Sequence, residues 1–340
     1  MKKTILFFLG LIIASVQTYA DTRATALLLH NGQGKSFDAD QLQQAVNEAV
    51  AGDTICLSAG TFMVGNADSD TLILDKAVSM IGAGEMTILA GNINIAIDGE
   101  PSYSNFCIDG IKLVQSIVIS KKMHGLRISK CFMLAIYATD AITGLQMDRC
   151  FATTFLPNAC MKSAVVTNSI FSWITSAFNL NFNSQGCDLI FNNCNIGQVS
   201  ERANNDLGEV HDATFTNCII QSIYRAKNPN DVSNNVYVNC LMANKIPSGN
   251  VVKDSYVQSF TINRNATNYN FPTFTSADGE ITQEWLQTNK YLGTDGTIVG
   301  AYGGASPYSL IPDGISIKES VLRVDPETRK LNVTLKVATE

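Results

Sequence analysis

The sequence is poor in charged side chains and has no long apolar stretch beyond its first residues. Only 16% of the 340 residues are charged, and 30 acidic residues outnumber 24 basic ones. Nucleic acids and anionic membranes bind basic surfaces, so this composition argues against both partners. After residue 20 no segment is long and apolar enough for a membrane-spanning helix. Low charge with many Asn, Ser and Thr favours a β-rich protein with polar turns over charged helices.

Several catalytic and metal-binding signatures are also absent. The chain has no Cys-x-x-Cys pair, so a structural zinc site is not expected. Neither GxSxG nor HExxH occurs. The GKS triplet that starts at Gly34 is not a phosphate loop, because Leu29 stands where that loop needs a glycine. The nine cysteines are an odd number, which cannot all pair within one exported chain.

The first twenty residues have the pattern of a secretory signal peptide. Lys2 and Lys3 give a positive start, an apolar run extends to Val16, and the small residue Ala20 precedes the expected cut. Removal of residues 1–20 leaves 320 residues with 22 basic and 30 acidic side chains, a net charge of −8. We therefore expect an exported protein, located in the periplasm, on the cell surface or in the medium.

An internal repeat indicates the fold. Short alternating segments recur, and each ends in a Cys or Ser after a polar residue. The intervals between these end positions are 19, 19, 25, 24, 22 and 15 residues. This period is too short for a propeller blade or a helical pair and suits one turn of a parallel β-helix. The end positions are Cys131, Cys150, Ser169, Cys194, Cys218, Cys240 and Ser255.

The repeat predicts which side chains stack. The cysteines should lie inside as mostly reduced thiols, because parallel side chains on neighbouring strands suit a disulfide poorly. Four of the end positions follow an Asn, a residue that accepts the left-handed backbone of a tight corner and can hydrogen-bond from coil to coil. These residues are Asn168, Asn193, Asn217 and Asn239. A further interior row is expected at Ile136, Phe155, Ile174, Val199 and Ile223.

The N-terminal region carries a family resemblance. Residues 37–50 have the pattern of a helix, with Asp38 or Asp40 as its cap. Its apolar face would comprise Leu42, Ala45, Val46 and Val50. The segments GDTICLSAGTF, KAVSMIGAG and TILAG follow. A short capping helix before such coils resembles the pectate-lyase-like β-helix superfamily, over roughly residues 36–240.

This resemblance implies an all-β fold, a single-stranded right-handed parallel β-helix with an N-terminal capping helix. We assign residues 21–305 to the solenoid, with roughly ten coils. Residues 281–289 are predicted to form a short helix, and residues 291–304 a last coil. In the remaining part, 306–340, two strands at 316–324 and 330–337 are predicted to form a hairpin that covers the open end of the solenoid.

The catalytic motifs of the resembled family are missing. Polygalacturonases of this family carry NTD, DD, GHG and RIK motifs, and none occurs in this chain. The WIDH-type signature of pectate lyases is also absent, and the nearest match, which starts at Trp173, has no acidic residue. Whether the chain is an enzyme therefore stays open at this point.

Counting along the coils brings one candidate surface together. Aromatic side chains next to the Ile136 row should face outward, since side chains alternate along a strand. Acidic and basic residues follow in adjacent coils, within reach of one another. The predicted ligand-binding residues are Tyr137, Trp173, Tyr224 and Arg202, and the candidate catalytic residues are Glu201, Glu209, Arg225, Lys227 and His211.

Three functions fit these residues. The leading one is glycan binding without cleavage, with the aromatic rings stacked on sugars. A polysaccharide lyase would use Arg225 or Lys227 as its base, and a retaining glycosidase would use Glu201 and Glu209 about 5 Å apart. The third is a structural or adhesive surface protein, in which Glu201 and Arg225 form a plain surface ion pair.

Two further features bear on cofactors and assembly. Asp98 and Asp109 each precede a glycine, which most simply indicates a turn, with a calcium site as the alternative. His124 before Gly125 is interpreted as a structural residue. No other cofactor is expected. The expected partner is a polysaccharide, and the chain is expected to be a monomer.

Overall fold

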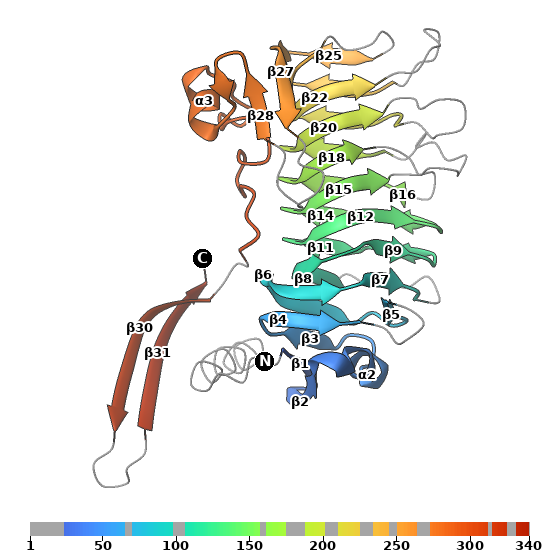
Figure 1. The fold of residues 1–340 in the computed structure, drawn as a ribbon, viewed down its shortest axis with the longest axis vertical. Coiled ribbons are helices and arrows are strands. Elements are labelled where there is room, and N and C mark those ends of the chain that lie inside the picture. The colour runs from blue at the N-terminus through green and yellow to red at the C-terminus, as the bar shows by residue number, and fades with distance from the viewer. Residues whose placement is uncertain are drawn as a thin grey trace.

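The computed structural model is a parallel β-solenoid of about seven turns, with a short helix near the N-terminus and a small antiparallel sheet near the C-terminus (Figure 1). It describes residues 24–64, 70–97, 106–156, 161–174, 188–200, 210–224, 234–244, 250–263, 273–311, 315–324 and 331–339. The predicted fold class is confirmed, with fewer turns than the ten expected. The predicted signal peptide lies outside the described residues. No helix within them has the length and apolarity that crossing a membrane requires.

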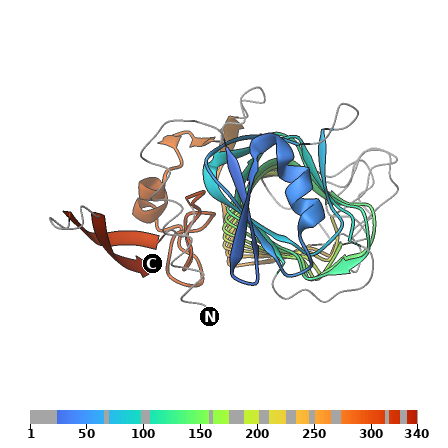
Figure 2. The same cartoon turned by 90° about the horizontal axis from the view of Figure 1, so that it is seen from below.

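An antiparallel hairpin and a helix close the N-terminal end. Seen along the stack, the helix lies across the first coil (Figure 2). Strand β1 pairs antiparallel with both β2 and β3, and the parallel stack begins with β3, which pairs in parallel with β6. The elements are β1 (Thr25–His30), β2 (Gln33–Asp38), the 3-10 turn η1 (Ala39–Gln41), α2 (Leu42–Glu48) and β3 (Thr54–Leu57).

The capping helix is shorter than predicted. Phe37 is a buried residue of β2 and not of the helix, because it pairs with Ala26 of β1. Asp38 caps the 3-10 turn, and its backbone N–H donates to Oε1 of Gln41 at 3.2 Å. The predicted apolar face is buried except for Val50, which lies beyond the end of the helix and is 49% exposed.

Each complete coil has a three-residue strand, a corner and a longer strand, and each type pairs in parallel with its own kind in the next coil. The first coils contain β4 (Gly60–Met63), β5 (Thr71–Leu74), β6 (Ser79–Ala90), β7 (Asn92–Ile95), β8 (Cys107–Leu113) and β9 (Ile117–Ile119). The short strands are β11 (Arg127–Ser129), β14 (Gln146–Asp148), β17 (Val165–Thr167), β19 (Ile190–Asn192), β21 (Thr214–Thr216), β23 (Val236–Val238) and β25 (Val251–Lys253). The long strands are β12 (Phe132–Ala138), β15 (Phe151–Leu156), β18 (Ile170–Ile174), β20 (Asn195–Ser200) and β22 (Ile219–Tyr224), followed by the shortened β24 (Leu241–Met242) and β26 (Tyr256–Val257). A third side carries β10 (Met123–His124), β13 (Ile142–Thr143) and β16 (Met161–Lys162).

The predicted corners are confirmed. Asn168, Asn193, Asn217 and Asn239 have φ between 46° and 55°, the left-handed conformation that Asn tolerates. Lys130, Arg149 and Asp254 take the same conformation at the equivalent positions. Only one described bond joins Asn side chains of neighbouring coils, from Nδ2 of Asn239 to Oδ1 of Asn217 at 3.2 Å. The corner therefore depends on backbone conformation more than on an Asn ladder.

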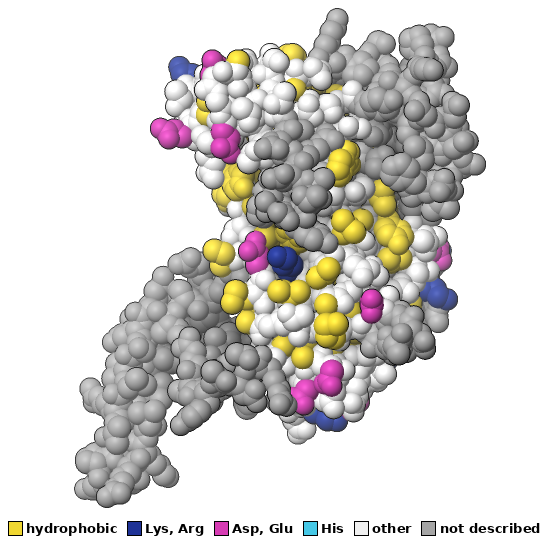
Figure 3. Space-filling model, viewed as in Figure 1, with side chains coloured by type: hydrophobic (Ala, Val, Ile, Leu, Met, Phe, Trp, Pro, Cys, Tyr) yellow, Lys and Arg dark blue, Asp and Glu magenta, His cyan; other side chains and the backbone are white. Residues whose placement is uncertain are grey.

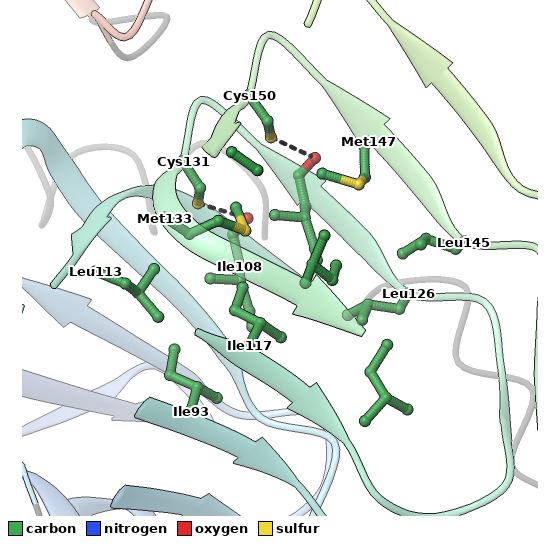
Figure 4. Close-up of a cluster of buried hydrophobic side chains, with 14 of the residues drawn as sticks. Ile93, Ile108, Leu113, Ile117, Leu126, Cys131, Met133, Leu145, Met147 and Cys150 are labelled. Carbon is green, nitrogen blue, oxygen red and sulfur yellow. Dashed lines mark hydrogen bonds between the residues drawn. The ribbon is translucent and has the colours of Figure 1, made fainter. Parts of the chain in front are cut away.

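The predicted cysteine row is also confirmed. All five cysteines of the repeat are fully buried, and none of the seven described cysteines forms a disulfide. Each thiol donates to the carbonyl oxygen two residues earlier, for example from Cys131 to Ser129 at 3.2 Å, and to a carbonyl of the preceding coil. Ser169 takes the same position, and its hydroxyl donates to the Thr167 carbonyl at 2.7 Å. Figure 4 shows Cys131 and Cys150 among the buried apolar side chains.

These buried thiols predict a loss of stability at alkaline pH. Burial raises the pKa of the Cys150 thiol from 9.0 to about 12, and it raises the pKa of Cys131, Cys218 and Cys240 as well. The folded state therefore holds its protons where the unfolded chain loses them. The contribution of these thiols to stability should be constant below about pH 9 and fall as the pH rises toward 12.

The measurement is the urea midpoint of unfolding as a function of pH. Cys150→Ser serves as the matched variant, because Ser169 fills the same position in the next coil. Removing one buried thiol should make the decline shallower by about 1.4 kcal/mol per pH unit between the two pKa values. Parallel curves for the two proteins above pH 9 would contradict a buried, protonated Cys150.

The other predicted interior row is in register. Ile136, Phe155, Ile174 and Val199 are fully buried neighbours in successive coils, and Ile223 continues the row at the edge of the core. A second row carries a stack of rings, with Phe191 and Phe215 4.9 Å apart and Phe215 and Tyr237 5.0 Å apart between centroids. Interplanar angles of 8° and 7° make this a nearly parallel ladder, fixed by the strand spacing.

The predicted last coil is instead a strap on the outside of the solenoid. Residues 290–311, here called the strap, follow the predicted short helix, which is confirmed as α3 (Gln283–Thr288). The strap runs back along the corners (Figure 1). Asn239 donates to the Leu292 carbonyl at 2.7 Å, and Asn168 donates to the carbonyls of Ala301 and Gly303 at 3.0 and 2.6 Å.

Apolar contacts and glycines explain why the strap fits there. Ala301 and Leu310 of the strap cluster with outward Phe132, Phe151 and Ile170 of the long strands. A Cβ on Gly300 would lie 2.3 Å from Oδ1 of Asn195, so the close approach needs glycine. The strap thus covers an apolar strip that the sequence analysis had not assigned to any partner.

The C-terminal end of the stack leaves core positions exposed. Val252 and Val257 continue the interior rows of Tyr237 and Met242, yet they are 48% and 61% exposed. The small sheet β27 (Phe260–Asn263), β28 (Thr273–Ser276) and β29 (Gly279–Glu280) follows. The predicted hairpin is confirmed as the antiparallel pair β30 (Ile315–Val324) and β31 (Leu331–Thr339). That it covers this end stays a prediction.

Candidate functional site

Most of the predicted acid–base residues cannot be placed. The backbone of Tyr224 is described, as the last residue of β22, and it pairs with Ser200 of β20. The two strands therefore end at the same level of adjacent coils, just before Glu201 and Arg225. Their predicted proximity stays a prediction. The residues outside the described part of the chain are Glu201, Arg202, Glu209, Arg225 and Lys227.

His211 belongs to a corner. It is partly buried and precedes Asp212, whose φ of 53° turns the chain into β21. The equivalent left-handed residues of neighbouring coils are Asp188 and Asn234. This position explains His211 as part of a repeated turn.

Trp173 lies in a row of partly exposed side chains on the outside of the long strands. This row, the Trp173 row, runs directly beside the buried Ile136 row, so its side chains point outward. Strand spacing places successive members about 4.8 Å apart. Its members in register are Ala135, Thr154, Trp173, Gln198 and Ser222.

Tyr137 and Tyr224 lie in a different row. Tyr137 is one residue past the buried row, where it pairs with Leu156, and Tyr224 occupies the same position four coils away. The predicted outer surface is therefore right for Tyr137 and Trp173, but the aromatic residues do not cluster. Four strand spacings separate the backbones of the two tyrosines by about 19 Å. One sugar ring cannot contact both, whereas an extended chain can.

The outer surface of the long strands, here called the long-strand face, has an unusual composition. Strands β12, β15, β18, β20 and β22 contain no Asp, Glu, Lys or Arg. Toward the N-terminal coils the face continues with exposed apolar side chains, of which Leu134 and Val114 are 41% and 38% exposed. In the view of Figure 3 the coils are covered largely by apolar and uncharged polar groups, with few charged side chains.

Charged residues occur on the short-strand side, where β11, β14 and β25 each contain one. Arg149 Nε lies 2.7 Å from Oδ2 of Asp148, and the Thr167 hydroxyl donates to Oδ1 of the same carboxylate at 2.8 Å. Ser129 donates to Asp109 in the coil before. Asp109 pairs with Ser129, so Gly110, with φ of 62°, holds the corner position of Lys130, which agrees with the predicted turn.

The acidic residues of the described part bear on the calcium alternative. The part of the chain that the structure describes contains no group of three or more His, Cys, Asp or Glu side chains that could hold a metal ion. Asp98 lies outside that part. His124 ends β10 and pairs with Thr143 of β13, which agrees with its interpretation as a structural residue.

No protein-family model, curated protein or solved structure matches the chain. The resemblance to the pectate-lyase-like superfamily is therefore supported at the level of a parallel β-solenoid. Among the outer surfaces of the solenoid, the long-strand face has a partly exposed aromatic residue, Trp173, flanked by Thr154 and Gln198.

Proposed function

We propose that this is an exported protein of the pectate-lyase-like kind that binds a polysaccharide on its long-strand face without cleaving it. The observation that carries the proposal is the Trp173 row, in which a partly exposed indole lies between Thr154 and Gln198 in adjacent coils. A sugar ring presents an apolar face and a rim of hydroxyl groups. An aromatic ring next to hydroxyl and amide side chains matches both.

The solenoid supports such binding in two ways. The side chains of the row stand on strands and not on loops, so their positions are fixed before the ligand arrives and little ordering entropy is lost. The row repeats along the stack at about 4.8 Å, so a linear polymer can make similar contacts with successive coils. Tyr137, two coils from the level of Trp173, extends the same surface.

Replacing Trp173 by alanine should weaken polysaccharide binding at least about tenfold, because stacking contributes about 1.4 kcal/mol or more. The chain has two tryptophans, and the other, Trp285, stacks on Tyr291 at 5.2 Å beside the strap. A Trp285→Phe variant therefore reports Trp173 fluorescence alone. Titrating that variant with polysaccharides measures binding at the proposed face.

Trp285→Phe is also the control for folding and should bind as the wild type does. Trp173→Ala must first show the wild-type far-ultraviolet circular dichroism spectrum. If this folded variant binds every polysaccharide as tightly as the wild type, the ligand does not contact the Trp173 row and the proposal is wrong.

A further inference from the structure

We infer that the ligand of the long-strand face is an uncharged polysaccharide and not a uronate polymer; this inference rests on the proposed function. The five long strands contain 30 residues, and none of them is Asp, Glu, Lys or Arg; the ranges are 132–138, 151–156, 170–174, 195–200 and 219–224. Every hydrogen-bonding side chain along the Trp173 row is neutral: hydroxyls, an amide and the indole itself.

A uronate needs a different surface. Each of its carboxylates loses hydration on binding, and proteins compensate for this with Arg or Lys side chains or with a bound cation. The described cation nearest in register is Lys112 of β8, which pairs with Phe132. Its Nζ lies 5.3 Å above the centre of the Phe132 ring, at the strip next to the strap contacts and not in the Trp173 row.

Charged residues occur elsewhere on the same solenoid. Asp109, Arg127 and Asp148 lie on the short strands or their N-terminal continuation, in β8, β11 and β14. Charge is therefore compatible with outward positions of this fold, yet none of the five long strands carries a charged residue. Neutral hydroxyl-rich chains bind such a surface through stacking and neutral hydrogen bonds, without a desolvated ion.

Two substitutions at one position test the sign of the ligand charge. Gln198 neighbours Trp173 in the row, and Glu and Lys both replace it with a side chain of similar length. With a neutral ligand, Gln198→Glu and Gln198→Lys should each weaken binding by about tenfold, because both bury a charge without a partner. Wild-type binding should change less than about twofold between about 50 and about 500 mM NaCl.

An anionic ligand would change the affinities of the two variants in opposite directions. Gln198→Lys would then bind as tightly as the wild type or more tightly, Gln198→Glu would lose binding, and salt would weaken the complex. That pattern overturns the inference and leaves the proposed function standing. Thr214→Lys and Thr214→Glu on β21 are the matched controls on the short-strand side and should leave binding unchanged. If the wild-type protein binds none of the polysaccharides tested, both the proposed function and this inference are wrong.

Discussion

Replacing Phe215 by alanine is expected to lower the free energy of unfolding by about 3–5 kcal/mol. The ring is fully buried between Phe191 and Tyr237, with centroid distances of 4.9 and 5.0 Å. The substitution removes apolar contacts on both faces and leaves a cavity that neighbouring coils cannot close, because their spacing is fixed by backbone hydrogen bonds.

Urea unfolding followed by circular dichroism measures this loss. Thr216→Ala, one residue on and facing outward, should change stability by less than about 0.5 kcal/mol. Phe215→Leu should fall between the two, since it fills part of the cavity. A loss below about 1 kcal/mol for Phe215→Ala would mean that the interior tolerates a missing ring and that the ladder adds little to solenoid stability.

Replacing Asn217 by alanine is the second large effect, with an expected loss of about 2–4 kcal/mol. Its side-chain oxygen accepts from the backbone N–H of Thr294 at 2.9 Å and from Nδ2 of Asn239 at 3.2 Å. The residue is buried and has φ of 55°. Alanine would lose these bonds, leave two donors without an acceptor and strain the left-handed corner.

Asn217→Gly separates the two contributions. Glycine accepts the left-handed backbone without strain, so this variant loses only the side-chain hydrogen bonds and should be the more stable of the two. Both variants should also make the strap, residues 290–311, more sensitive to limited proteolysis, which the Phe215 variants should affect less. Wild-type resistance of the strap in both Asn217 variants would show that Asn217 does not hold it.

The interior of the solenoid could be predicted because equivalent positions of a repeat can be found by counting residues from one period to the next. The Cys positions and the Ile136 row follow from one alternating strand per period, and both are buried as expected. Four of the left-handed corners follow from the Asn that precedes the Cys or Ser position. Lys130 and Arg149 take the left-handed conformation at the same position, so the place in the coil and not the residue type sets the corner. A search for Asn alone would not have found these two corners.

The strap could not be predicted in the same way. Residues 291–304 contain the glycines and alternation of a coil, and only the structure shows that they contact the corners of coils about 100 residues earlier, such as Ala301 with Asn195. Gly300 and Gly303 were the available signal, because both sit where a side chain would clash. Non-local docking of this kind leaves no periodicity in the sequence.

The candidate site was predicted in part. Alternation correctly placed Tyr137 and Trp173 on the outer surface, since each lies beside a buried residue of the Ile136 row. It did not show that they belong to two rows, because the count treated positions before and after that row as one surface. The sequence shows that these segments contain no charged residues. Only the pairing of the five strands in register shows that they form one continuous surface.

The most direct test of the account is to incubate the purified mature protein with a panel of neutral and uronate polysaccharides, with and without calcium. Retention on each polymer, new reducing ends and absorbance from unsaturated uronates would be measured together. The account predicts retention on at least one neutral polysaccharide, independent of calcium and without any product. Cleavage of any polymer, or retention on none, would contradict it.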